Sequence, residues 1–279
     1  MKLTLGFSPC PNDTFIFDAL IHHKIDTEGL EFEVIFDDVE TLNQKAFKAE
    51  LDITKLSYHA YAYALNDYVL LDSGSALGFG VGPILLSKYP QDLNHSNLKI
   101  GIPGKYTTAN FLLSLAYPKL KNKIELVFSD IEQKLLDEEI DLGLIIHENR
   151  FTYQDKGLIK VKDLGEYWEE KTHCAIPLGG IVVKRSLPDE LKQKVNRLVR
   201  KSVAFAFENP SSALPFIKAH AQEMDEKVMY QHIELYVNKY SIDLGNDGKT
   251  AIHTLFDEAF KNNIIPASTQ ELFLTKSQL

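Results

Sequence analysis

His147 combines the residue type and the position that acid–base chemistry requires. It directly follows the apolar run at residues 142–146, and of the nine histidines in the chain it alone ends such a run. An imidazole has an ordinary pKa of about 6.5, so it can accept and return a proton near neutral pH. A histidine that serves only packing or the surface is the alternative interpretation. We predict that His147 is a catalytic general base.

Lys55, Leu56 and Ser57 end another predicted strand and offer polar groups at a comparable position. The Ser57 hydroxyl and the backbone groups around it could hold a hydroxyl or a carboxylate of a ligand. A nucleophilic pair with His147 would also need an oxyanion hole and a third orienting group, and the sequence has no Gly-x-Ser-x-Gly elbow. We therefore predict that these three residues bind a ligand.

Thr107 and Thr108 belong to the segment 104–109, which opens a predicted helix directly after a predicted strand. Exposed N–H groups and the positive end of the helix dipole favour a carboxylate or a similar anion at such a place. A threonine there can equally serve as an ordinary N-cap. The sequence leaves both interpretations open.

Residues 8–15 read Ser-Pro-Cys-Pro-Asn-Asp-Thr-Phe. The two prolines fix the backbone around Cys10, and Asn12 or Asp13 is expected to cap the helix that follows. A thiol nucleophile at Cys10 would need a basic partner, and none is near it in the sequence. A rigid wall of a binding cleft is the better interpretation of this loop.

The elements that position these residues alternate between strands and helices, which predicts an α/β protein with mostly parallel sheets. The first unit has strands at 2–8, 30–36 and 52–57 and helices at 14–23, 39–50 and 58–65. The second has strands at 98–103, 123–129 and 141–147 and helices at 108–117 and 131–138. The similar order of the two units predicts a structural duplication.

Two β-rich segments, 81–87 and 179–184, bracket the second unit, and glycines mark the start of each. The chain is expected to cross between two lobes there, because a hinge needs residues that absorb changes in φ and ψ. We predict a larger α/β lobe made of residues 1–88 and 185–279 and a smaller α/β lobe made of residues 89–184. Helices expected to pack mainly on the first lobe follow at 190–207, 211–222, 227–240 and 248–262.

Ligands of open α/β sheets bind beyond the carboxyl ends of the strands. Lys55 to Ser57, Thr107 to Thr108 and His147 all stand at such ends. If the two lobes face each other, these residues converge on a single cleft.

Composition restricts the partners of the protein. The chain has 279 residues, 44% hydrophobic and 25% charged, with a net charge of −9. No cluster of Lys and Arg interrupts the acidic balance, so nucleic acid and anionic membranes are not expected partners, whereas a small molecule is. The two cysteines, and the lack of a recognisable export signal or membrane-spanning segment, lead us to expect a cytoplasmic protein.

Several of these segments occur together in one known family. They include SPCPNDTFIF at residues 8–17, TKLSY at 54–58, PGKYTTA at 103–109 and GLIIHE at 143–148. Further matching segments are 38–43, 78–83, 150–153, 177–181 and 236–238. Over nearly its whole length the sequence closely resembles the 1,4-dihydroxy-6-naphthoate synthase family, which acts in the futalosine route to menaquinone.

The resemblance implies the fold of two-lobed, type II periplasmic binding proteins, with a ligand cleft between the lobes and a helical C-terminal region. It implies a carbon–carbon lyase that converts cyclic dehypoxanthinyl futalosine to 1,4-dihydroxy-6-naphthoate, without a metal or an organic cofactor. It further implies that His147 is the general base. The residues implied to contact the substrate are Lys55, Leu56, Ser57, Thr107 and Thr108.

Two other functions compete with this one. The chorismate dehydratase of the same pathway shares the two-lobed fold, but it is expected to lack the loop at residues 8–15. A non-catalytic solute-binding protein or ligand sensor would need an export signal or a DNA-binding helix pair, and we recognise neither in the sequence. Turnover of cyclic dehypoxanthinyl futalosine would separate the three.

Overall fold

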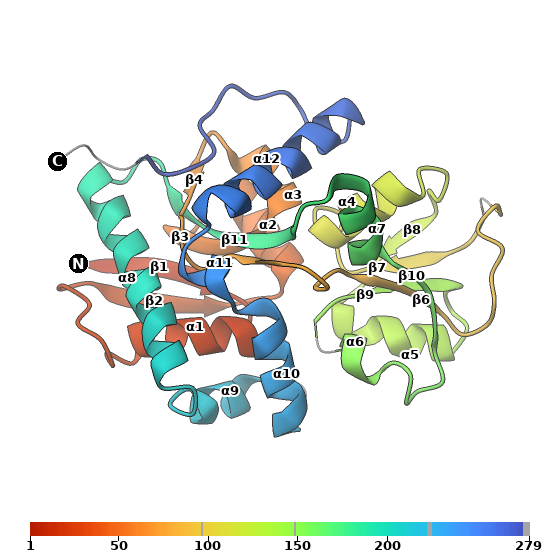
Figure 1. Ribbon diagram of the computed structural model, residues 1–279, viewed down its shortest axis with the longest axis horizontal. Helices are drawn as coiled ribbons and strands as arrows, with labels where there is room; N and C mark the ends of the chain where they lie inside the picture. The colour runs from red at the N-terminus through yellow and green to blue at the C-terminus, as the bar shows by residue number, and fades with distance from the viewer. Residues whose placement is uncertain (96, 148, 222–224, 276–279) are drawn as a thin grey trace.

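The computed structural model describes residues 1–95, 97–147, 149–221 and 225–275. In Figure 1 the chain forms two α/β lobes that lie beside each other, each built on its own sheet. Among the described residues, no helix is both long enough and apolar enough to cross a membrane.

The first sheet contains both parallel and antiparallel strands. Its order is β2 (Glu31–Phe36), β1 (Lys2–Phe7), β3 (Ile53–Ser57), β11 (Ile176–Lys184) and β4 (Tyr68–Leu70), and β5 (Ala76–Gly78) also pairs with β11. The strand β1 is parallel to β2 and β3. The long strand β11 runs antiparallel to β3, β4 and β5. The carboxyl ends of β1 and β3 therefore meet at one edge of the sheet.

The second sheet repeats this arrangement. Its order is β8 (Lys123–Glu125), β7 (Ile100–Ile102), β9 (Leu142–Ile145), β6 (Ile84–Ser87) and β10 (Ile159–Asp163). The strand β7 is parallel to β8 and β9, and β6 is antiparallel to both β9 and β10. The predicted duplication is therefore present in the strand order, whereas the prediction of mostly parallel sheets missed the antiparallel strands beside β3 and β9.

The predicted lobe boundaries differ from the observed strand pairing. Within the predicted larger lobe, β6 pairs with β9 of the second sheet; within the predicted smaller lobe, β11 pairs with β3 of the first sheet. The chain thus crosses between β5 and β6, and again between α7 (Leu164–Thr172) and β11. Gly179 and Gly180 lie inside β11 and not ahead of a hinge. An apolar run predicts a strand, but its partner strands decide which sheet it joins.

Close backbone contact marks the first crossing. A Cβ atom built on Gly82 would stand 2.2 Å from the Cα of Gly165, so two glycines are required where the crossing meets the start of α7. Arg150 Nη1 donates a hydrogen bond to the Gly82 carbonyl at 2.7 Å. The Asp163 carboxylate caps α7 by accepting from the amides of Gly165 and Glu166. The crossing is thereby fixed to the second lobe.

The helices divide between the lobes largely as predicted. The first lobe carries α1 (Pro11–Ile21), α2 (Val39–Phe47) and α3 (Tyr58–Ala64); the second carries α4 (Thr108–Ala116), the 3₁₀ turn η1 (Phe128–Asp130), α5 (Ile131–Leu136), α6 (Asn149–Thr152) and α7. The C-terminal helices are α8 (Asp189–Glu208), α9 (Leu214–His220), α10 (Glu226–Tyr236), α11 (Lys239–Ile242) and α12 (Gly245–Lys261). The prediction that they pack on the first lobe is confirmed, since α8, α9 and α10 pack against α1, and α12 against β11 and α3. The predicted end of one helix at Gln222 lies outside the described residues.

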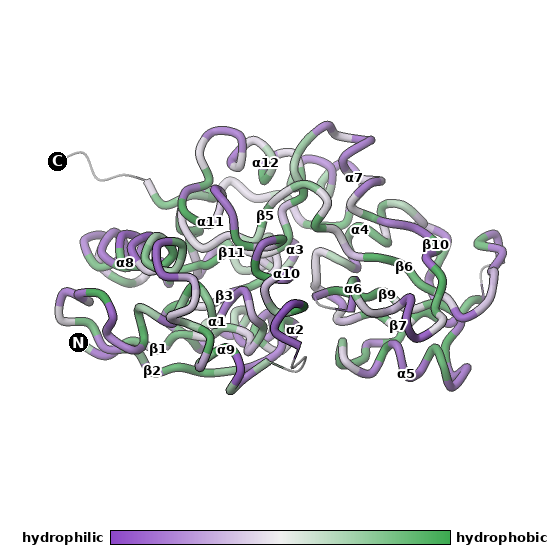
Figure 2. Tube along the Cα trace, turned by 60° about the horizontal axis from the view of Figure 1, so that its bottom comes forward, coloured by the Kyte–Doolittle hydropathy of each residue, from purple (hydrophilic) through white to green (hydrophobic). Residues whose placement is uncertain are grey.

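Apolar packing under the first sheet fixes the start of α1. The rings of Phe7 on β1 and Phe17 on α1 lie 4.4 Å apart, and both side chains are fully buried. Ser202 of α8 donates to the carbonyl of Ile16 at 2.6 Å and accepts from the amide of Leu20. In Figure 2 the strands of both sheets are largely hydrophobic, whereas α8 alternates between hydrophilic and hydrophobic residues. These contacts hold α1 against β1 and α8, and they thereby fix the position of the loop that precedes α1.

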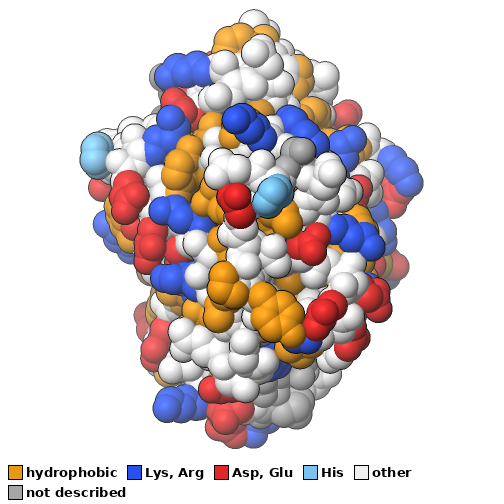
Figure 3. Space-filling model, turned by 90° about the vertical axis from the view of Figure 1, so that its right-hand side faces the viewer, with side chains coloured by type: hydrophobic (Ala, Val, Ile, Leu, Met, Phe, Trp, Pro, Cys, Tyr) orange, Lys and Arg blue, Asp and Glu red, His pale blue; other side chains and the backbone are white. Residues whose placement is uncertain are grey.

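The surface of the second lobe carries charges of both signs. Figure 3 looks onto this end of the molecule and shows acidic side chains interspersed with Lys and Arg, separated by small apolar areas. No large area of one sign is visible on this face. A polyanion would find no continuous basic surface here.

Candidate functional site

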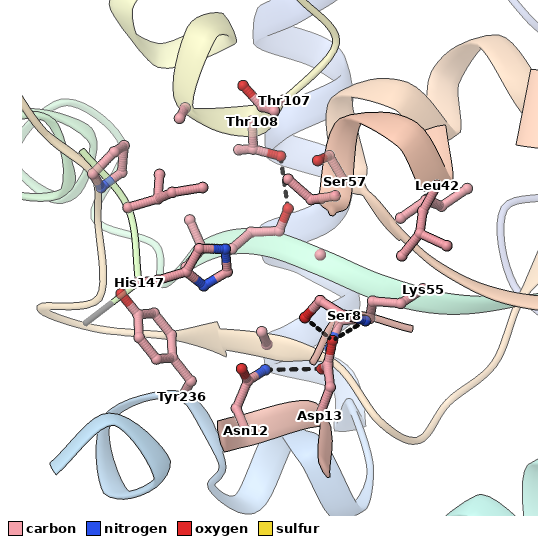
Figure 4. A pocket seen from close by; sticks show the side chains of 18 of the residues that line it. Ser8, Asn12, Asp13, Leu42, Lys55, Ser57, Thr107, Thr108, His147 and Tyr236 are labelled. Atoms are coloured by element: carbon pink, nitrogen blue, oxygen red, sulfur yellow. Dashed lines mark hydrogen bonds and ion pairs between the residues drawn. The ribbon is translucent and has the colours of Figure 1, made fainter. Parts of the chain in front are cut away.

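The six residues selected from the sequence line one cavity of about 100 Å³ between the lobes. In Figure 4, Thr107 and Thr108 lie above the space, Lys55 and Asp13 below it, and His147 beside Tyr236. The structure therefore brings together His147, Lys55, Leu56, Ser57, Thr107 and Thr108. Their individual roles remain predictions.

His147 lies just beyond β9, in a left-handed backbone conformation. Its φ is +60°, in the left-handed region, which is strained for a residue with a side chain and is often found at functional sites. Its ring packs edge-on against Phe128 at 4.9 Å and stacks with His232 of α10 at 5.8 Å. A second cavity, of about 150 Å³, also has His147 in its wall. The imidazole thus stands where two cavities meet.

Lys55 is paired with a buried carboxylate. Its Nζ lies 2.6 Å from Asp13 Oδ1, and Asp13 Oδ2 accepts from the Ser8 hydroxyl at 2.8 Å. The prediction that Asn12 or Asp13 caps α1 is wrong. The N-cap is Cys10, without a side-chain hydrogen bond, and Pro11 occupies the first turn, where its missing N–H is not needed. Asp13 is consequently available to hold Lys55.

Ser57 is held by Asn43 of α2. The Ser57 amide donates to Asn43 Oδ1 at 3.0 Å, and Asn43 Nδ2 donates to the Ser57 hydroxyl at 3.3 Å. Since the hydroxyl accepts this bond, its own hydrogen can be donated to a ligand. Asn43 is fully buried, and nothing in the sequence distinguished it from a solvent-facing helical asparagine. Only the fold could reveal its role.

The two threonines differ in what they do. Thr107 Oγ1 accepts from the Asn110 amide at 3.2 Å, so the N-cap interpretation of this residue is confirmed. Thr108 Oγ1 donates to the Leu178 carbonyl of β11 at 2.7 Å, which links the lobes. The same oxygen accepts from the His59 amide at 3.4 Å, which leaves one lone pair for a ligand. Thr108 is therefore suited to accept a hydrogen bond from a ligand hydroxyl.

Glu40 of α2 also joins the two lobes. Its Oε2 accepts from the Tyr106 amide of the second lobe at 3.1 Å. Burial raises the pKa of Glu40, while hydrogen bonds from Gln44 and Asn43 oppose that rise. Glu40 and Leu178 of the first lobe thus contact Tyr106 and Thr108, the residues on either side of the N-cap of α4.

His59 of α3 also forms a hydrogen bond with the N-cap residue of α4. Its Nδ1 lies 3.2 Å from the Thr107 carbonyl and therefore carries the ring hydrogen. Burial lowers the pKa of His59 to about 4, although this hydrogen bond opposes the shift. The unfolded chain, with an ordinary value, takes up a proton at a pH where the folded protein does not. His59 consequently favours folding above pH 6.5, and this contribution is lost as the pH falls towards 4.

Replacing His59 with glutamine is expected to weaken the acid sensitivity of the fold. Between pH 7 and pH 4 the free energy of unfolding should fall by about 3 kcal/mol less in this variant than in the unmodified protein. Urea denaturation at the two pH values measures the difference. An equal fall in both proteins would contradict a neutral, buried His59.

Two kinds of functional group were not predicted from the sequence. Tyr236 at the end of α10 lines the cavity, and His232 stacks on His147, although both belong to the C-terminal helices. Leu42, Val39 and Leu178 give much of the cavity an apolar wall.

In the described ranges, no three His, Cys, Asp or Glu side chains are grouped so that they could hold a metal ion.

A family model described as menaquinone biosynthesis matches residues 3–261 of the chain. The protein belongs to this family. Two curated members, both named 1,4-dihydroxy-6-naphthoate synthase, match over almost their full lengths. The one from Thermus thermophilus is 44% identical and covers 98% of this chain and 99% of its own. The one from Streptomyces coelicolor is 40% identical and covers 95% of each.

Solved structures place this member of the menaquinone biosynthesis family among periplasmic-binding-protein-like folds. An Archaeoglobus fulgidus protein superimposes with a TM-score of 0.90 at 38% identity, covering 95% of this chain and 98% of its own. The alkanesulfonate-binding protein of Xanthomonas axonopodis gives a TM-score of 0.71 at 10% identity, covering 95% and 94%. The fold class expected from the sequence is confirmed.

Proposed function

We propose that this enzyme is a 1,4-dihydroxy-6-naphthoate synthase, a carbon–carbon lyase of menaquinone biosynthesis that acts on cyclic dehypoxanthinyl futalosine. The observation that carries the proposal is the 44% identity, over almost the entire chain, to a curated synthase. The grouping of His147 with Ser57 and Thr108 in one cavity supports it, because a base and hydroxyl-binding groups surround a common space.

The reaction begins when His147 removes a proton from a hydroxyl on the sugar-derived ring. The oxygen then forms a carbonyl, and the adjacent carbon–carbon bond breaks in a retro-aldol step. Its electron pair passes to the ring system as an enolate, whose oxygen is protonated by the imidazolium of His147. Loss of the fragment makes the naphthalene system aromatic, which drives the reaction forward, and His147 ends the cycle neutral.

The cavity walls suit the two kinds of surface on such a substrate. The apolar side chains of Val39, Leu42 and Leu178 match a flat ring system. The hydroxyl groups of Ser57 and Thr108 match the polar substituents, and the positive end of α4 favours a carboxylate. We expect the lobes to close over the bound substrate and thereby to exclude water from the enolate.

A direct assay tests the proposal. The purified protein is incubated with cyclic dehypoxanthinyl futalosine, and 1,4-dihydroxy-6-naphthoate is sought by mass and absorbance; chorismate is tested in parallel. Formation of the naphthoate with no change to chorismate is the expected result. Consumption of chorismate would favour the dehydratase, and binding without turnover would favour a solute-binding protein.

We also propose that the enzyme acts in the cytoplasm. Cys10 and Cys174 are present as thiols and form no disulfide with each other. Thiols are the usual state of cysteine in a reducing compartment.

A further inference from the structure

A second histidine, His232, stacks its ring on the imidazole of His147. The two rings are nearly parallel, with their centroids 5.8 Å apart and their planes inclined by 19°. His232 belongs to α10 of the first lobe and is completely buried, whereas His147 belongs to the second lobe. The stacking therefore joins the proposed base to the opposite lobe.

Asn12 fixes the orientation of the His232 ring. His232 Nε2 lies 2.9 Å from Asn12 Oδ1, and Asn12 Nδ2 lies 2.9 Å from Asp13 Oδ1. A carboxylate paired with Lys55 can only accept, so the NH₂ group of Asn12 faces Asp13 and its oxygen faces His232. His232 consequently donates through Nε2, and its ring cannot rotate without breaking this bond.

The surroundings of His232 keep it neutral. Burial lowers its pKa well below the ordinary value, and the nearby positive charges of His147 and Lys55 lower it further. Tyr236, on the same helix, packs its ring 4.7 Å away. Because His232 carries no charge, it can lie against His147 without opposing the positive charge that His147 gains when it accepts a proton.

We propose that His232 is a positioning residue for His147: its ring, oriented by Asn12, is the surface on which the base stacks. This inference rests on the proposed role of His147 in the synthase reaction. It also gives a role to Asn12 and Asp13, the polar residues in the first turn of α1. Hydrogen bonds run from His232 through Asn12 and Asp13 to Lys55. The same network therefore orients the ring behind the proposed base and the cavity-lining Lys55.

Two substitutions separate the ring from its hydrogen bond. His232→Gln keeps an amide that can donate to Asn12 but removes the ring. His232→Phe keeps a ring that His147 can stack on but removes the donor. His253→Gln, on the exposed face of α12, is the control for loss of a histidine elsewhere.

For His232→Gln we expect kcat to fall by about 10- to 100-fold while KM changes little, because a misplaced base slows chemistry more than binding. His232→Phe should retain most of the activity, with a lower Tm, and His253→Gln should behave as the unmodified protein. Unchanged kcat in His232→Gln would overturn the proposal. If that variant does not fold, a loss of more than about 100-fold in folded His232→Phe would overturn it.

An NMR measurement without substrate distinguishes this inference from the proposed reaction. The ring signals of His147 should shift in His232→Gln and stay in place in His253→Gln, since only the first removes a stacked ring. Unshifted signals would refute the stacking. A protein that shows the shift but does not turn over the substrate would contradict the synthase proposal and leave the support of His147 by His232 intact.

Discussion

Replacing His147 with glutamine is expected to lower kcat by about 10²- to 10⁴-fold, the usual cost of losing a general base. Glutamine is similar in length and remains polar, but it cannot take up a proton at neutral pH. The steady-state rate of naphthoate formation measures the effect. KM should change much less than kcat, because the walls formed by Ser57, Thr108 and Leu42 are untouched.

The control for this variant is its folding and its binding of substrate. Residue 147 has a φ of +60°, a region that histidine adopts more readily than glutamine, so we expect the Tm to fall slightly and the protein to remain folded. Calorimetry should still detect substrate binding. If turnover persists within about tenfold of the unmodified rate, another group is the base.

Replacing Asp13 with alanine is expected to destabilise the fold by about 3–5 kcal/mol. The substitution leaves the ammonium group of Lys55 buried without its carboxylate, and it also removes an acceptor from Ser8 and Asn12. The free energy of unfolding from urea denaturation measures the loss. Activity should fall as well, since Lys55 lines the cavity.

A double variant tests whether the buried charge is the cause. In Asp13→Ala/Lys55→Met no ammonium group is left unpaired, so part of the lost stability should return. The exposed pair of Lys2 and Glu33 provides a comparison, because Glu33→Ala should cost no more than about 1 kcal/mol. A double variant less stable than the sum of its single substitutions would show that the pair is not coupled in this way.

Much of the site could be predicted because strand ends are visible in a sequence. The predicted strands before Ser57 and His147 end at residues that line the cavity, and the Thr107–Thr108 segment follows a third predicted strand. The parallel strands β1, β3, β7 and β9 bring these ends to facing edges of two sheets. Local pattern and sheet geometry are sufficient for that result.

The remaining features depend on contacts between distant segments. The sheet membership of β6 and β11 is decided by pairing across the lobes, which an apolar run does not encode. Asn43 and His232 are helical residues whose partners, Ser57 and Asn12, are set by tertiary packing. The error at Asp13 concerns a helix boundary: α1 begins at Pro11, so Asp13 is its third residue and not its N-cap, and its carboxylate pairs with Lys55 of β3. Side-chain networks of this kind become visible only when the fold is assembled.

A crystal structure of His147→Gln with cyclic dehypoxanthinyl futalosine bound would test the central claim most directly. We predict that the substrate occupies the cavity between the lobes, with its ring system against Leu42 and Leu178. The hydroxyl to be deprotonated should lie about 3 Å from the side chain at position 147. A substrate bound elsewhere, or held with every hydroxyl beyond hydrogen-bond reach of that side chain, would contradict the assignment of His147 as the base.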